Sequence, residues 1–194
     1  MKPIWKLFEV DNHQAISEQV YEYIINHTDI LNSKRGPVFY NDISPIHMVQ
    51  HVPLLEKFLN DNFLIPTTAA VIVLPPGRTN TLHVDTVDPF VRILWPVKNC
   101  QGSLTKLYDV PRECIELTYF PLESSTTYYN IVGDRDWPLL DEIELLQPVL
   151  IDVSVAHEVN LAPNATEPRI SFTLGFDRDL PISKSIKAWF GFQR

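Results

Sequence analysis

The feature that most restricts the fold of this chain is a succession of short β-rich runs that begins after residue 66. The runs end at turn-like segments such as Pro75-Pro76-Gly77. Chains of this texture build a sandwich or jelly-roll core, in which two sheets pack face to face. We expect strands at Thr67–Leu74, Thr79–Asp85, Phe90–Val97, Leu104–Tyr108, Cys114–Phe120, Val149–Val155 and Arg169–Phe176.

The first 66 residues carry a helical pattern instead. Apolar residues recur at three- and four-residue spacing from Asn12 to Asn26 and again from Pro53 to Asn62. The expected fold class is therefore α+β, mainly β, in one domain of 194 residues. Residues 1–66 would form a helical support, 67–176 the jelly-roll core and 177–194 a C-terminal tail. Residues Leu139–Leu146 are ambiguous and are compatible with a helical turn.

The last predicted strand indicates where the helices and a pocket lie. Because side chains alternate along a strand, one face is apolar and the other polar. We expect the apolar face to lie under the helices, while the polar face either meets water or lines a barrel-like pocket. The apolar face holds Ile170, Phe172, Leu174 and Phe176, and the polar face holds Arg169, Ser171, Thr173 and Gly175.

Composition excludes several classes of function. The formal net charge is -8 and no stretch concentrates Lys and Arg, which argues against a non-specific grip on nucleic acid. Cys100 and Cys114 are too few for a disulfide framework, so free thiols in a reducing compartment are expected. The N-terminus has no apolar signal region, and no apolar run is long enough to span a bilayer. We expect a soluble cytoplasmic protein without nucleic-acid or membrane partners.

One pair of residues suggests a metal site. His83 and Asp85 lie two apart on a predicted strand, so both side chains point to the same side. His157, at the end of the run Val149–Ala156, supplies a third ligand. Two imidazoles and one carboxylate leave coordination positions open, which suits a non-haem iron(II) site that takes a chelating cosubstrate and oxygen. Taken singly, the sequence favours an ordinary surface-strand histidine at His83 and a hydrogen-bonded core histidine at His157.

A fourth element strengthens the metal hypothesis. Arg169-Ile170-Ser171 follows His157 by twelve residues, and Arg169 and Ser171 share one face of their predicted strand. A guanidinium pairs bidentately with a carboxylate, and a serine hydroxyl can add a hydrogen bond. These groups could hold the far carboxylate of 2-oxoglutarate. The alternative for Arg169 is an ion pair on the surface.

The order His83-x-Asp85, His157, Arg169-x-Ser171 resembles the signature of the 2-oxoglutarate- and iron(II)-dependent oxygenase superfamily. The sequence is also loosely similar to aspartyl/asparaginyl hydroxylase-like and prolyl hydroxylase-like proteins. The resemblance implies a double-stranded β-helix fold, related to cupins, with iron(II), 2-oxoglutarate and molecular oxygen as reactants. It further implies succinate and carbon dioxide as products. The expected reaction is hydroxylation of a C–H bond in a peptidyl side chain, an amino acid or another small metabolite.

The chain departs from the family pattern at one place. Leu74 stands where prolyl hydroxylase-like members often have a tyrosine, so the extra hydrogen bond to the cosubstrate would come from Tyr108 or Thr105. Two further residues are candidates for the substrate side. Arg92, in an otherwise apolar strand, would bind a substrate carboxylate or form a structural ion pair. Asn160 would orient His157 or simply close a strand.

Two other classes of function remain open from the sequence. The first is a jelly-roll binding module that recognises a sugar or peptide without redox chemistry. The second is a cupin-like metal enzyme that does not use 2-oxoglutarate, in which the Arg-x-Ser spacing would be accidental.

Overall fold

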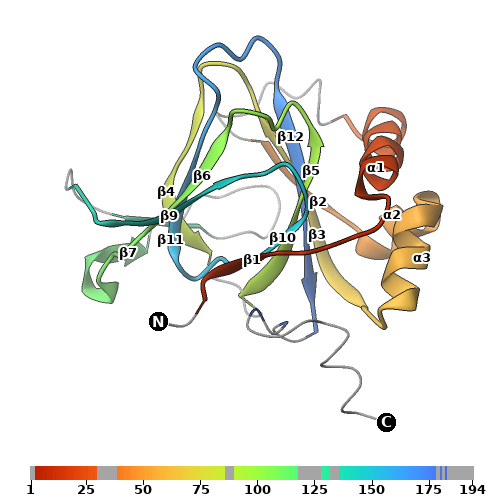
Figure 1. The fold of residues 1–194 in the computed structure, drawn as a ribbon, viewed down its shortest axis with the longest axis horizontal. Coiled ribbons are helices and arrows are strands. Elements are labelled where there is room, and N and C mark those ends of the chain that lie inside the picture. The colour runs from red at the N-terminus through yellow and green to blue at the C-terminus, as the bar shows by residue number, and fades with distance from the viewer. Residues whose placement is uncertain are drawn as a thin grey trace.

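The computed structural model of the chain is mainly β, with its helices near the N-terminus (Figure 1). It describes residues 3–29, 39–85, 90–117, 128–131, 136–177, 180 and 182. Within these residues, no helix is both long and apolar enough to cross a membrane. Cys100 and Cys114 are both free thiols.

Two six-stranded antiparallel sheets face each other (Figure 1). Strands β3 to β6 alternate between the two sheets, and so do β10 to β12, which brings β4 and β11 opposite β12. Sheet A has the order β1 (Trp5–Leu7), β10 (Val149–Asp152), β5 (Val91–Lys98), β12 (Arg169–Phe176), β3 (Pro66–Leu74) and β2 (Phe39–Ile43). Sheet B has the order β7 (Ile115–Leu117), β8 (Tyr128–Ile131), β4 (Thr79–Asp85), β11 (Ala156–Asn160), β6 (Leu104–Tyr108) and β9 (Leu139–Glu144).

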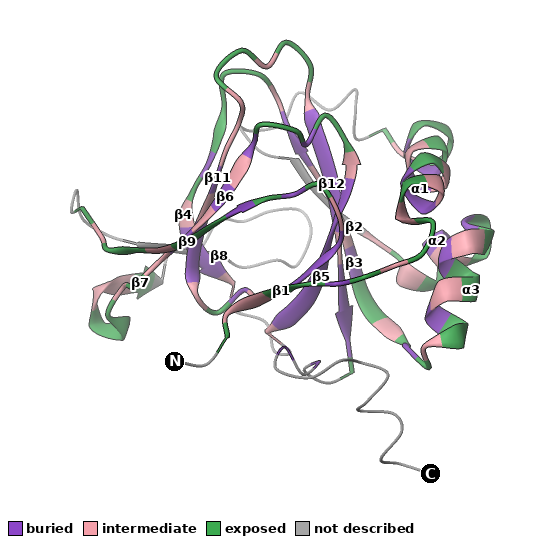
Figure 2. Cartoon of the chain, viewed as in Figure 1, coloured by how far each residue is buried: buried purple, intermediate pink, exposed green. Residues whose placement is uncertain are grey.

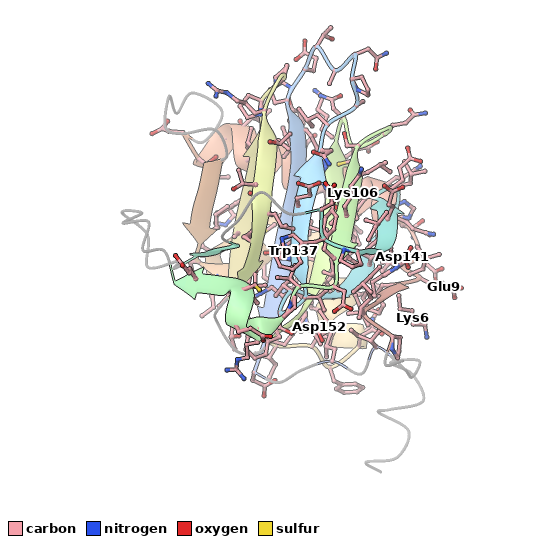
Figure 3. The ribbon with its side chains drawn as sticks, turned by 90° about the vertical axis from the view of Figure 1, so that its left-hand side faces the viewer. Lys6, Glu9, Lys106, Trp137, Asp141 and Asp152 are labelled. Carbon is pink, nitrogen blue, oxygen red and sulfur yellow. The ribbon has the colours of Figure 1, made fainter. Side chains whose placement is uncertain are left out.

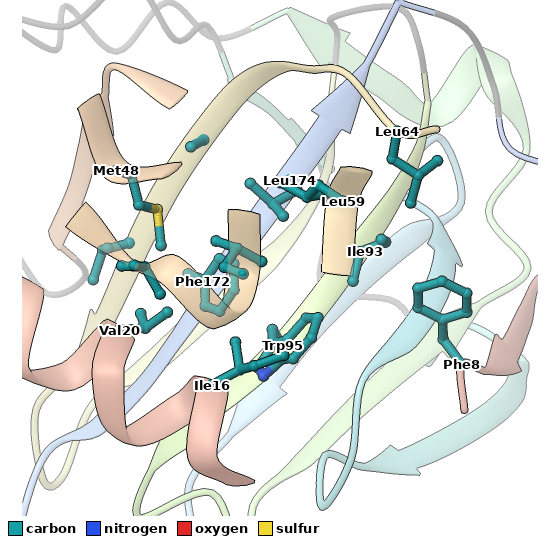
Figure 4. Close-up of a cluster of buried hydrophobic side chains, with 14 of the residues drawn as sticks. Phe8, Ile16, Val20, Met48, Leu59, Leu64, Ile93, Trp95, Phe172 and Leu174 are labelled. Atoms are coloured by element: carbon teal, nitrogen blue, oxygen red, sulfur yellow. The ribbon is translucent and has the colours of Figure 1, made fainter. Parts of the chain in front are cut away.

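The helices α1 (His13–His27), α2 (Pro45–His51) and α3 (Pro53–Asp61) cover the outer face of sheet A (Figure 1). Their buried side chains meet the apolar faces of β5 and β12 in one core, where Trp95 stacks on Phe172 with ring centroids 5.4 Å apart (Figure 4). Both rings are fully buried. The strands under the helices are mostly buried, whereas the outer surfaces of the helices are exposed (Figure 2). This close-packed core holds sheet A rigid, so the side chains on the opposite face of the sheet have a fixed support.

The structure confirms that helices occupy the two predicted segments and that the apolar face of β12 lies beneath them. The expectation for Leu139–Leu146 was wrong, because this segment forms β9, an edge strand paired with β6. The predicted strand Cys114–Phe120 is observed as β7, and its last three residues lie outside the described part. The short elements β1, β2 and α2 were not predicted, so the N-terminal region contributes strands to sheet A as well as helices. The strands β8 and β11 were not predicted either, because the expected run from Val149 ends as β10 and the chain then crosses to sheet B as β11.

Candidate metal and cosubstrate site

The backbone of sheet B brings the predicted metal ligands together. β4 and β11 are neighbours, and their register places His83 directly opposite His157. Asp85 lies two residues along β4, on the same face as His83. One ligand atom from each of the three residues lies within 4.8 Å of the others, and Nε2 of His83 is 3.6 Å from Oδ1 of Asp85. In the described part of the chain, no other trio of His, Cys, Asp or Glu is so arranged.

Backbone hydrogen bonds set the tautomer of both histidines. Nδ1 of His83 is 2.7 Å from the carbonyl oxygen of Thr81, and Nδ1 of His157 is 2.8 Å from that of Val155. A carbonyl oxygen only accepts, so each Nδ1 carries the proton and donates it. The lone pair of each ring is then on Nε2, the arrangement seen in metal-binding histidines. The two rings lie side by side, with centroids 4.3 Å apart.

The protonation state of His83 also suits a metal ligand. Burial lowers the pKa of His83 to about 4, and the neighbouring His157 contributes in the same direction. The carboxylate of Asp85 and the hydrogen bond to Thr81 raise the pKa, but they do not offset burial. His83 is therefore neutral near pH 7, which is the form that binds metals. Two imidazole nitrogens and a carboxylate on one face are a donor set that fits iron(II).

The triad opens into a cavity of about 310 Å³ between the two sheets. Arg169 lines the same cavity from the first position of β12, although only 1% of the residue is exposed. Its Nη1 donates a hydrogen bond of 3.2 Å to Oγ of Ser171, which is fully buried on the same face of the strand. Ser171 thus positions Arg169 and does not itself line the cavity.

Of the two residues predicted to give the cosubstrate an extra hydrogen bond, the structure brings only Thr105 to the cavity. Thr105 lies opposite Val159 in the β6–β11 register and is 1% exposed. Its Oγ1 has no hydrogen-bond partner among the described residues. A buried hydroxyl in this state costs free energy unless something in the cavity bonds to it. Its neighbour Lys106 points out from the other face of sheet B (Figure 3).

Tyr108 and Asn160 lie away from the cavity. Both donate hydrogen bonds to Oε1 of Glu158, at 2.7 Å and 2.9 Å. Burial, followed by the hydrogen bond to Glu158, raises the pKa of Tyr108, so its hydroxyl stays protonated. Tyr108 is three residues from Thr105 on one strand, and an odd spacing places side chains on opposite faces. The expected roles of Tyr108 at the cosubstrate and of Asn160 beside His157 therefore have no support in the structure.

The cavity is also lined by residues that were not predicted from the sequence. Arg92 was considered and does line the cavity, but no site residue was expected in β3. The structure places Thr68, Ala70 and Ile72 in the lining, whereas Val71 and Val73 on the opposite face of β3 belong to the core under the helices. These lining residues could have been predicted from the alternation of side chains along β3. A strand that packs one face beneath helices turns its other face toward the second sheet.

Comparison with known proteins finds solved structures that are similar to this chain but no related sequence. No protein-family model matches the chain, and no curated protein matches its sequence. The crystal structure of SnoK, a non-haem alpha-ketoglutarate-dependent carbocyclase from nogalamycin biosynthesis, matches 89% of this chain and 79% of its own with a TM-score of 0.52 at 10% identity. A prolyl-4-hydroxylase from Pseudomonas putida covers 90% of this chain and 92% of its own, with a TM-score of 0.47 and 15% identity. The likeness to SnoK is one of overall fold.

Proposed function

We propose that this protein is an iron(II)- and 2-oxoglutarate-dependent oxygenase whose two sheets form a double-stranded β-helix. His83, Asp85 and His157 would hold the iron, and Arg169 would bind the far carboxylate of 2-oxoglutarate. One observation carries the proposal: a set of two histidines and a carboxylate opens into the same cavity as a buried arginine. The planar fork of the arginine matches the far carboxylate of a dicarboxylic acid that chelates the metal.

Different residues of the chain would bind the metal and the cosubstrate. When bound, iron(II) would supply the activation of oxygen and the oxidative decarboxylation of 2-oxoglutarate to succinate. Arg169, steadied by Ser171, offers a planar fork to the carboxylate. Thr105 offers a hydroxyl that can donate to the same ligand. Leu94, Ile151 and Val153 line the cavity with apolar surface, which excludes water and strengthens these polar contacts.

The expected outcome is hydroxylation of a C–H bond. A cavity of about 310 Å³ is at the low end of the range for ligand pockets. The cosubstrate takes part of this space, so the cavity suits a small substrate or the end of one side chain. The protein supplied with iron(II), 2-oxoglutarate, oxygen and a reductant is expected to form succinate and carbon dioxide in equal amounts. Protein that binds both iron and 2-oxoglutarate but forms no succinate above an iron-free control would contradict the proposal.

Replacement of Thr105 by valine tests the hydroxyl in the cavity. Valine keeps the shape of threonine but has no hydroxyl, so a bound 2-oxoglutarate loses one hydrogen bond. Its dissociation constant should rise about 3- to 10-fold, since one hydrogen bond contributes about 0.5–1.5 kcal/mol. The free energy of unfolding should be unchanged or higher, because a buried hydroxyl without a partner is removed. Calorimetry and chemical denaturation measure the two effects, and unchanged 2-oxoglutarate binding would place Thr105 outside the cosubstrate site.

A further inference from the structure

Arg92 is a second arginine in the metal cavity. It lies on β5, is 8% exposed and lines the cavity together with the triad and Arg169. Among the described lining residues, Arg92 and Arg169 are the cations and Asp85 is the carboxylate. A buried guanidinium is costly unless it is hydrogen-bonded or meets an anion. Arg92 is held within the protein by contacts that include a hydrogen bond to Thr68. The proposed cosubstrate would engage Arg169, while Arg92 is a second guanidinium that lines the same cavity.

The side chain of Arg92 lies across the neighbouring strand on the cavity face of sheet A. The strand order is β5-β12-β3, and Nη1 of Arg92 donates a hydrogen bond of 2.6 Å to Oγ1 of Thr68 on β3. The guanidinium therefore passes over β12 at Gly175. Any side chain at Gly175 would collide with this guanidinium and with the hydroxyl of Thr68. The glycine thus provides the space that Arg92 occupies.

The two arginines occupy different ends of the cavity. Arg169 is bonded to Ser171 and Arg92 lies over Gly175, four residues further along β12, which is about 13 Å along a strand. Backbone hydrogen bonds connect the amide of Asp85 to Val153 and the amide of Val153 to Phe90, two residues before Arg92. Arg92 therefore lies at the end of the cavity nearer to Asp85, away from the end that Arg169 occupies.

We propose that Arg92 binds a carboxylate of the primary substrate, so that the substrate is a small carboxylic acid such as a free amino acid. This inference rests on the proposed function. The two carboxylates of 2-oxoglutarate are then already used, one at Arg169 and one at the metal. A guanidinium at the other end of the cavity matches a further carboxylate from a different molecule, because its fork pairs with that group bidentately.

The test uses the full chain loaded with iron(II) and 2-oxoglutarate under nitrogen. The probes are the L-amino acids and straight-chain acids of two to six carbons, each compared with its primary amide. Binding is measured by the shift of the thermal midpoint and by the change in the visible spectrum of the metal complex. At least one acid is expected to bind saturably and about 10- to 100-fold more tightly than its amide, as for a charge-assisted pair.

Variants locate the effect at Arg92. Arg92→Gln should weaken binding of that acid about 10- to 100-fold and leave the affinity for 2-oxoglutarate within about twofold. Arg92→Lys should recover part of the loss, because it keeps the charge. Gly175→Ala keeps the arginine but fills the space that the guanidinium occupies, so it should weaken binding of the same acid. The matched control is Lys98→Gln, a cation on the same strand that is exposed and bonded to Tyr21.

Each contrary outcome has a distinct meaning. If acids bind no better than their amides to protein that binds 2-oxoglutarate, the role of Arg92 is wrong and the proposed function stands. If Arg92→Gln no longer binds 2-oxoglutarate while Arg169→Gln still binds it, Arg92 holds the cosubstrate and the inference is again wrong. If Arg92→Gln does not fold, the Gly175→Ala variant decides the question. A Gly175→Ala protein that binds the acid as tightly as the wild type would overturn the inference. Failure of the wild-type protein to bind 2-oxoglutarate would instead reject the proposed function itself.

Discussion

Replacement of Asp85 by alanine is expected to weaken iron(II) binding by at least about 100-fold, because even groups that only orient a ligand contribute 10- to 100-fold. The variant keeps His83 and His157, but it loses the anionic donor that, among the described residues, lies within 4.8 Å of both. Two neutral imidazoles then face a divalent cation without a compensating charge. Competition with a coloured chelator under nitrogen measures the affinity, and turnover of 2-oxoglutarate should be abolished.

The matched control for this variant is Asp109→Ala. Asp109 is exposed directly after β6 and does not line the cavity, so its replacement makes the same change of net charge without touching the site. Iron affinity in this variant should equal that of the wild type. An Asp85→Ala protein that keeps wild-type iron affinity would show that the aspartate is not a ligand.

The second large effect is expected from Arg169→Gln. Two charge-assisted hydrogen bonds to a carboxylate contribute about 1.5–3 kcal/mol each, so the dissociation constant of 2-oxoglutarate should rise about 100- to 10,000-fold. Arg169 is 1% exposed, so water cannot readily replace the lost donors. Iron affinity should not change, because the arginine lies on the sheet opposite to the ligands. Calorimetric titration of the metal-loaded variant with 2-oxoglutarate measures the effect.

Arg112→Gln serves as the control for charge. Arg112 is exposed in the short 3-10 helix between β6 and β7, far in sequence from the triad and outside the cavity lining. Unfolding curves of both variants separate a loss of fold from a loss of binding. If Arg169→Gln is folded and binds 2-oxoglutarate like the wild type, the cosubstrate is held by other residues.

The parts of the site that could be predicted from sequence depend on local geometry. His83 and Asp85 share a face because they are two apart on one strand, and the same rule places Arg169 with Ser171. The apolar and polar faces of β12 could be assigned in the same way. These relations hold within one strand, so they do not depend on how the strands are arranged.

The parts that could not be predicted depend on pairing between distant segments. β1 and β2 are short edge strands that exist because β10 and β3 offer them hydrogen bonds. β9 shows an irregular pattern of burial because one of its faces meets water at the edge of sheet B. Strand alternation shows that Thr105 and Tyr108 face opposite sides, but only the position of β11 decides which of them faces the cavity.

The proposed oxygenase must bind iron(II) and 2-oxoglutarate together in one cavity. An anaerobic titration of the metal-free protein with iron(II) and then 2-oxoglutarate tests it most directly, through the visible charge-transfer band of the chelated metal. We expect a band that requires both components, that is lost in His83→Ala and that needs far more 2-oxoglutarate in Arg169→Gln. Folded protein that binds iron but gives no band at saturating 2-oxoglutarate would contradict the account. It would favour a metal enzyme without this cosubstrate, and absence of iron binding would favour a binding module.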